Sequence, residues 1–128
     1  MGNNNDYYLV LTNLIEELDK EGYKNNSLPA RRIASPVNSV SVPSIQIQTS
    51  EKAPLVIYDI EIGRKISDEM MRKWKDHASK CGFFYLIVPE EIKEMVDSAC
   101  AKELFNYIII PFRFTREGPN RNVVFQFP

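Results

Sequence analysis

Two carboxylates stand close together at the end of the apolar stretch "APLVIYDIEIGRK", residues 53–65. Side chains alternate along a strand, so Asp59 and Glu61 would share one face with Cα atoms about 6.5 Å apart. That spacing suits two oxygen ligands of one hard cation, and Mg²⁺ is typically held by one or two carboxylates together with water and substrate phosphate. A cation held there would stabilise the transition state of phosphodiester hydrolysis and activate water. Asp59 and Glu61 are therefore candidate metal ligands and candidate catalytic residues.

Basic residues follow the two carboxylates directly. Residues 63–80 contain six basic and three acidic side chains, whereas the net charge of the whole chain is −1. This near-neutral total argues against a protein held to nucleic acid by bulk charge alone. Lys65 is a candidate to assist the hydrolysis. The candidate contacts for nucleic-acid phosphates are Arg31, Arg32, Arg64, Lys65 and Lys73. A structural alternative stays open, in which the two carboxylates simply pair with neighbouring basic side chains.

The first half of the chain is predicted to contain one helix and three strands. Leu11, Leu14 and Leu18 recur at helical spacing, which predicts a helix over residues 6–21 with these side chains buried against a sheet. Asp6 is a good N-cap for this helix, and Gly22 is a good residue to end it. Clusters of β-branched residues predict strands at residues 31–35, 40–48 and 55–62.

The second half of the chain alternates helices and strands. Ser67 is placed to cap a helix with Trp74 on its inner face. Two apolar runs, residues 83–88 and 105–112, have the composition of buried strands, and Pro89 would open the helix between them. Such β-α-β units connect parallel strands by right-handed crossovers. The tail contains a turn at Gly118-Pro119 and a short strand at residues 123–127.

The fold predicted from these elements is α/β. We expect one domain over residues 1–128, with three layers, a mixed sheet and the element order α-β-β-β-α-β-α-β. Residues 6–112 would form its core and residues 113–128 a C-terminal tail. A chain of 128 residues that is 44% hydrophobic and 26% charged is long enough and apolar enough for one such core.

Two further expectations concern the compartment and the cysteines. The sequence contains no apolar run of the ~20 residues that a membrane span needs, and it begins without the basic segment of a secretory signal. We therefore expect a cytoplasmic protein that does not associate with a membrane. Cys81 and Cys100 are expected to be reduced core residues, because with the single His77 they form no recognisable zinc motif.

The stretch "PLVIYDIEIGRKISDEMMRKWKDHASKCGFFYLIVP", residues 54–89, resembles the PD-(D/E)XK nuclease superfamily, which has the restriction-endonuclease-like fold. The likeness lies in a strand that ends in acid-x-acid, then a Ser-initiated helix with a central Trp, then a buried strand that ends in "IVP". The element order over residues 6–88 also matches the core of that fold. The resemblance implies a three-layer α/β domain that binds DNA and cleaves its phosphodiester bonds with Mg²⁺.

Carried over residue by residue, the superfamily motif is degenerate in this chain. Asp59 matches the (D/E) position, and Glu61 stands where the superfamily usually has Lys. Ser44, in "VPSIQIQ", stands where the superfamily has a metal-binding Asp, and a neutral hydroxyl binds Mg²⁺ less strongly than a carboxylate does. The resemblance implies that the missing ligand comes from the first helix, where Glu16 and Glu17 are the candidates and Glu17 is the one we select.

Three functional readings stay open on the sequence alone. The first is a Mg²⁺-dependent DNA phosphodiesterase, an endonuclease-like domain with weakened or lost catalysis. The second is a non-catalytic module of the same fold that binds nucleic acid or another protein. The third is an unrelated α/β interaction domain. The sequence also leaves open whether the chain acts alone, as a homodimer or beside a partner protein.

Overall fold

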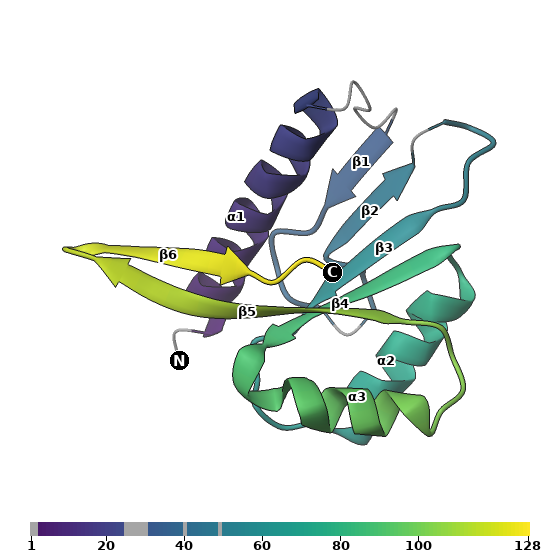
Figure 1. The fold of residues 1–128 in the computed structure, drawn as a ribbon. Helices are drawn as coiled ribbons and strands as arrows, with labels where there is room; N and C mark the ends of the chain where they lie inside the picture. Colours follow the sequence, from purple (N-terminus) through teal and green to yellow (C-terminus); the bar gives the residue numbers. More distant parts are fainter. Residues whose placement is uncertain (1–2, 25–30, 40, 49) are drawn as a thin grey trace.

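Six strands form one mixed sheet, with three α-helices packed against it, in the part of the chain that the structure describes (Figure 1). This computed structural model describes residues 3–24, 31–39, 41–48 and 50–128. In chain order the elements are α1 (Asn3–Lys24), β1 (Arg31–Ala34), β2 (Ile45–Gln48), β3 (Val56–Ile60), α2 (Asp68–Ser79), β4 (Phe83–Pro89), the 3₁₀ helix η1 (Glu90–Ile92), α3 (Lys93–Ala101), β5 (Ile108–Glu117) and β6 (Asn120–Phe125). The fold is therefore mixed α/β, as predicted.

The strands lie side by side in the order in which the chain forms them, from β1 to β6. The first three strands pair antiparallel, β3, β4 and β5 pair parallel, and β6 returns antiparallel along β5. In the parallel part, Tyr58 of β3 lies opposite Tyr85 of β4, and Tyr85 lies opposite Ile108 of β5. The predicted parallel pairing of the two strands in the second half is confirmed.

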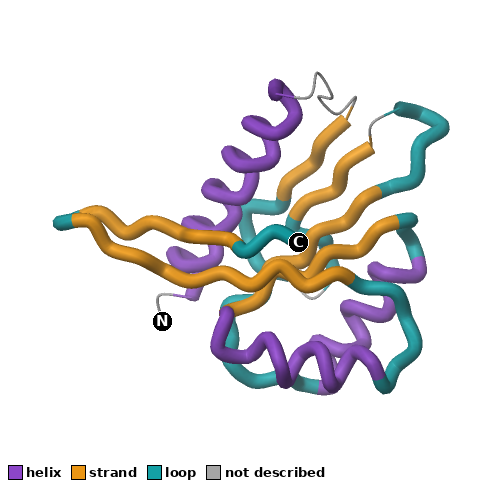
Figure 2. The backbone as a smooth tube through the Cα atoms, viewed as in Figure 1, coloured by secondary structure: helices purple, strands orange, loops and turns teal. Residues whose placement is uncertain are grey.

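One hydrophobic core lies between α1 and the sheet. Figure 2 shows α1 running beside the strands. The buried face of α1 repeats at helical spacing, and Leu11 and Leu14 are buried as predicted, while Leu18 is partly buried. The predicted helix boundaries are wrong, because α1 begins at Asn3 and extends past Gly22 to Lys24. Asp6 therefore lies in the first turn rather than at the N-cap, and its carboxylate pairs with Arg121 of β6 at 3.0 Å.

A second hydrophobic core lies on the opposite face of the sheet, under α2 and α3. Trp74 of α2 is fully buried there, and the Ser67 hydroxyl accepts a hydrogen bond from the Met70 amide, so the predicted N-cap is confirmed. The prediction that Pro89 opens a helix is wrong. Pro89 is the last residue of β4, where it lies opposite Phe112 in the sheet, and η1 separates it from α3.

Several strands differ in extent from the predictions. β2 covers only the last part of residues 40–48, of which residue 40 lies outside the described residues, and β3 ends at Ile60, so that Glu61 follows the strand. β5 runs from Ile108 to Glu117, and β6 pairs with it through a turn at Gly118 with φ +59°. The predicted turn is confirmed, but residues 113–128 are not a separate tail, because they supply β6 and part of β5. This hairpin extends beyond the rest of the sheet (Figure 1).

Candidate functional site

Asp59 lies near the end of β3, and its carboxylate is completely buried. Its Oδ2 atom lies 2.6 Å from Nδ1 of His77 on α2, and its Oδ1 atom accepts a longer hydrogen bond of 3.4 Å from the Ser44 amide. Asp59, the candidate metal ligand and catalytic residue, is therefore closed off from solvent. The alternation of the strand aims Asp59 into the sheet face that α2 covers, and both carboxylate oxygens have protein partners there.

Ser44 is also buried, and its hydroxyl accepts a hydrogen bond of 3.0 Å from the Ile60 amide. Tyr7, at the start of α1, donates a hydrogen bond of 2.9 Å to the Ser35 carbonyl nearby. Burial raises the pKa of Tyr7, and the charges of Asp59 and Glu61 add to this effect while a hydrogen bond with Ser44 opposes it. Ser44, which stands where the superfamily has an Asp, thus links the start of β2 to β3 and lies near Tyr7 of α1.

Glu61 lies just beyond β3 and borders a small cavity of about 140 Å³. Lys73 of α2 lines the same cavity and is only 6% exposed. Burial raises the pKa of Glu61, the positive charge of Lys73 lowers it, Asp59 raises it, and a hydrogen bond with Asn38 lowers it. The cavity lining is completed by Asn38, Ser39, Glu69 and Met70. Asp59 does not line this cavity, so the two carboxylates share a face of the sheet but no common open cleft.

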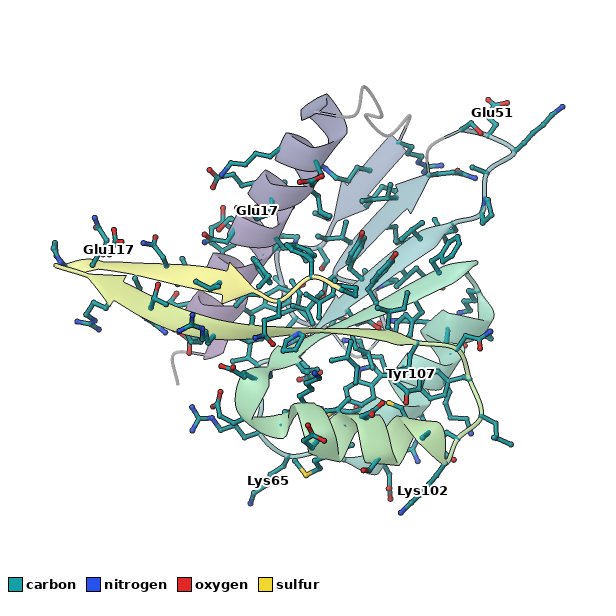
Figure 3. All side chains as sticks on the ribbon, in the orientation of Figure 1. Glu17, Glu51, Lys65, Lys102, Tyr107 and Glu117 are labelled. Carbon is teal, nitrogen blue, oxygen red and sulfur yellow. The ribbon has the colours of Figure 1, made fainter. Side chains whose placement is uncertain are left out.

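Lys65 and Glu17 are not part of this arrangement. Lys65 is exposed on the loop before α2, and Figure 3 shows its side chain directed away from the molecule. Glu17 belongs to α1 and borders a cavity together with Tyr58, whose side chain lies on the α1 face of the sheet. Because Tyr58 and Asp59 are consecutive in β3, they point to opposite faces. The sheet therefore separates Glu17 from Asp59, and Glu17 pairs instead with Lys20 at 3.4 Å.

The five basic residues predicted to contact nucleic acid do not form one surface. Lys73 is buried beside Glu61, so it could contact a phosphate only after its side chain moved to the surface. Arg31 and Arg32 lie on β1, at the far edge of the sheet, and Arg32 pairs with Asp19 of α1. Arg64 is exposed and pairs with Glu91 at 3.0 Å.

The carboxylates predicted to hold Mg²⁺ do not fit one ion in this arrangement. Mg²⁺ requires near-octahedral oxygen ligands around one point. Asp59 is held by His77, Glu61 faces Lys73, and Glu17 lies across the sheet. Among the described residues no group of three or more His, Cys, Asp or Glu side chains is arranged to hold a metal ion.

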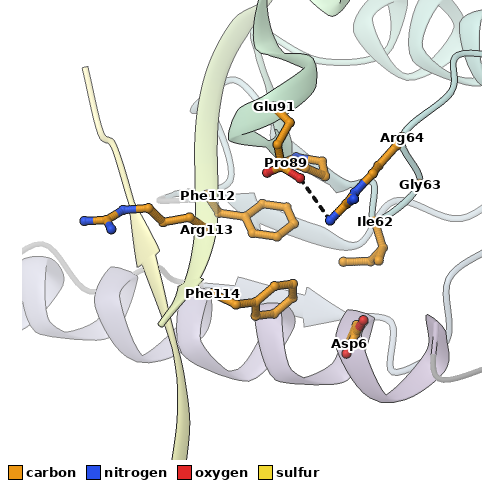
Figure 4. Close-up of a pocket in the computed structure, with 9 residues that line it drawn as sticks. All are labelled: Asp6, Ile62, Gly63, Arg64, Pro89, Glu91, Phe112, Arg113 and Phe114. Atoms are coloured by element: carbon orange, nitrogen blue, oxygen red, sulfur yellow. Dashed lines mark ion pairs between the residues drawn. The ribbon is translucent and has the colours of Figure 1, made fainter. Parts of the chain in front are cut away.

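A larger cavity of about 450 Å³ opens at the carboxyl ends of β3 and β4, beside the middle of β5 (Figure 4). Its lining is formed by Asp6, Ile62, Gly63, Arg64, Pro89, Glu91, Phe112, Arg113 and Phe114. The rings of Phe112 and Phe114 meet edge to face at 5.5 Å between centroids. In Figure 4 both rings face the cavity, whereas the side chain of Arg113 points away from it. Ligands of open α/β sheets bind outside the carboxyl ends of the strands, which is the edge where this cavity lies.

The roles of His77 and Lys73 were not found from the sequence, although a signal exists. Met70, Lys73, Trp74 and His77 follow the i, i+3, i+4, i+7 spacing of one helix face. Because Trp74 was predicted to be buried, the same spacing indicates that Lys73 and His77 point toward the sheet. Which strand residue each of them meets depends on how α2 crosses the sheet, and the spacing does not reveal that.

Comparison with protein-family models, with curated proteins and with solved structures finds no match for this chain. None of the described helices combines the length and the apolar character that crossing a membrane requires.

Proposed function

We propose that the chain is a nuclease-like α/β domain of the restriction-endonuclease-like type, which binds DNA and in which phosphodiester hydrolysis is weakened or lost. The element order from α1 to β5 and the position of helices on both faces of the sheet support this assignment. The acid-x-acid sequence at the end of β3 and the capped helix that follows it support it too.

The environment of Asp59 is the observation that favours weakened catalysis. A carboxylate that serves Mg²⁺ must offer its oxygens to the ion, but both oxygens of the buried Asp59 side chain are held by protein groups. Binding of a cation there would have to break the contact with His77 and leave that side chain buried without its partner. Ser44 offers no charge in compensation, and its hydroxyl is held by the Ile60 amide.

DNA binding is proposed to occur at the carboxyl edge of the parallel strands. Arg64 and Lys65 are exposed there, beside the cavity that contains Phe112 and Phe114. Nucleic-acid contacts of this kind depend on ionic strength, because each phosphate neutralised by an arginine or lysine releases counterions. We expect weak, salt-dependent binding rather than tight binding, because the chain has no net positive charge.

A role as a protein-interaction module is the second candidate. Arg32, Arg64 and Lys80 each form an ion pair with an acidic neighbour, which reduces the positive charge available to phosphates. Fluorescence anisotropy with labelled duplex and single-stranded DNA at low and high salt discriminates the two. Binding that falls with salt supports the DNA role, and no binding at low salt contradicts it.

Catalysis is tested by incubating plasmid and single-stranded DNA with the protein and Mg²⁺ or Mn²⁺, beside the Asp59→Ala and Glu61→Gln variants. We expect slow or undetectable cleavage by the wild-type chain. Rapid cleavage that both substitutions abolish, in variants that retain their circular dichroism spectrum, would contradict the loss of catalysis. Isothermal titration with the same ions measures whether the wild-type chain binds them.

A further inference from the structure

We propose that the cavity at the carboxyl ends of β3 and β4, beside the middle of β5, binds one unpaired nucleotide, with the base against the Phe114 ring and the phosphate on Arg64. This inference rests on the proposed DNA-binding function and specifies the part of a DNA strand that the site takes. The volume of this cavity, about 450 Å³, lies within the range of small-molecule sites, which is roughly 300–1,000 Å³.

The inner wall of the cavity favours a flat, weakly polar group. Ile62 and Phe114 supply partly exposed apolar surface, and the buried side chains of Pro89 and Phe112 lie behind it and fix its position. Arg121 lies over the Phe114 ring at 4.4 Å from its centroid, so the ring is held by a cation on one side. Unpaired bases are commonly bound by stacking or packing on aromatic side chains and arginine planes.

The rim of the cavity carries groups of both charges. Arg64 pairs with Glu91 at 3.0 Å, and Asp6 pairs with Arg121 at 3.0 Å. The Arg64 side chain is 76% exposed and that of Glu91 53%, so their ion pair is readily replaced. A nucleotide can supply a new partner to each member of this ion pair. Its phosphate pairs with Arg64, and an exocyclic amino group of the base donates a hydrogen bond to Glu91.

This exchange predicts a base preference. Adenine, cytosine and guanine carry an exocyclic amino group, whereas uracil and thymine do not. Uracil and thymine can offer Glu91 only the ring N3–H, and the two carbonyl oxygens that flank this N3–H repel a carboxylate, so they replace Arg64 less well. We therefore expect the cavity to favour the three amino-bearing bases over uracil and thymine.

The test is isothermal titration of the wild-type protein with the monophosphates of cytidine, adenosine, guanosine and uridine, and with ribose 5-phosphate. We expect cytidine monophosphate to bind more tightly than uridine monophosphate and ribose 5-phosphate. Arg64→Ala and Phe114→Leu should each weaken binding by about tenfold, the size expected for one lost phosphate or aromatic contact. Lys80→Ala, which removes an exposed cation on α2, is the matched control and should leave binding unchanged.

Anisotropy with single-stranded, duplex and bulged DNA separates this inference from the proposed function. If the wild-type protein prefers single-stranded or bulged DNA, and Arg64→Ala and Phe114→Leu each abolish this preference, the result supports both the nucleotide site and the proposed DNA binding. Equal binding of all three DNAs, unaffected by the two cavity variants, overturns the nucleotide site and leaves DNA binding intact. Binding of monophosphates in the cavity without binding of any DNA supports the site and contradicts the DNA function. No binding of any monophosphate overturns the nucleotide site.

Discussion

The Nδ1 atom of His77 lies 2.6 Å from the Oδ2 atom of Asp59, and neither side chain is more than 2% exposed. The contact joins α2 to β3 at the only histidine in the sequence. It also places a polar pair among the buried apolar side chains on that face of the sheet, where Lys73 is buried as well. Asp59 thus acts as a structural anchor for α2.

Removal of His77 should therefore destabilise the fold strongly. His77→Ala leaves the buried Asp59 carboxylate without its closest partner, and breaking a buried pair lowers the free energy of unfolding by about 3–5 kcal/mol. Urea denaturation followed by circular dichroism measures this change. Asp76→Ala, which removes the exposed pair with Lys80, is the control and should change the free energy by about 0–1 kcal/mol. Equal effects of the two substitutions would show that the buried pair does not anchor α2.

Glu61 should make stability depend on pH. Burial raises its pKa above the ordinary value of 4.5, so ionisation of Glu61 is less favourable in the folded chain than in the unfolded chain. The wild-type protein should therefore lose stability relative to Glu61→Gln as the pH rises through and above the ordinary pKa of a glutamate. The pKa of Glu61 is raised even though the positive charge of Lys73 lowers it. Urea denaturation at a series of pH values tests it, with Glu94→Gln on α3 as the control for loss of one carboxylate. If the difference in the free energy of unfolding between the wild type and Glu61→Gln stayed constant across the pH series, the raised pKa of Glu61 would be refuted.

Gly82 should not tolerate a larger residue. A Cβ atom at this position would lie 2.5 Å from the Cβ atom of Pro54, and the proline ring cannot move aside independently of its backbone. Gly82→Ala should lower the free energy of unfolding by about 1–3 kcal/mol, as overpacking does elsewhere. Gly63→Ala is the matched control, because a Cβ there meets nothing within 4 Å, and its effect should be within about 0.5 kcal/mol. Thermal unfolding distinguishes the two, and a neutral Gly82→Ala would contradict the close packing.

The two cysteines should differ in reactivity. Both are free thiols, but Cys100 is fully buried and its pKa is raised to about 12, by burial first and then by Asp97 and Glu103, whereas Cys81 is half-buried. A thiol-disulfide reagent should therefore react slowly with Cys81 in the native protein, and with Cys100 only after unfolding. Cys81→Ser and Cys100→Ser identify the reacting thiol. Faster reaction of Cys100 in the native state would show that α3 opens readily.

The elements were largely predictable because local patterns determine them. Leu11 and Leu14 mark the buried face of α1 by their spacing, and Ser67 marks the start of α2 by its capping side chain. Boundaries were less predictable where a distant partner decides them. Asp6 lies inside α1, where it pairs with Arg121, and those two residues are 115 positions apart in the chain.

The candidate site was predictable only in part. Strand alternation correctly placed Asp59 and Glu61 on one face of the sheet. Strand alternation could not show that His77 contacts the Asp59 carboxylate or that Lys73 lies near Glu61. Both contacts arise from the way α2 packs across β3. Burial of a carboxylate is a property of the assembled layers rather than of the strand that carries it.

The spatial order of the strands, which follows the order of the chain, has a consequence for biosynthesis. Each strand after β1 can add to an edge that already exists, so no strand has to be inserted between two neighbours that formed earlier. Consecutive strands are joined by loops or, between the parallel strands, by segments that form the helices α2 and α3, so each new pairing closes only the segment of chain made since the previous strand. The sheet can therefore grow in one direction during translation, with the β5–β6 hairpin closing last, when residues 118–125 leave the exit tunnel.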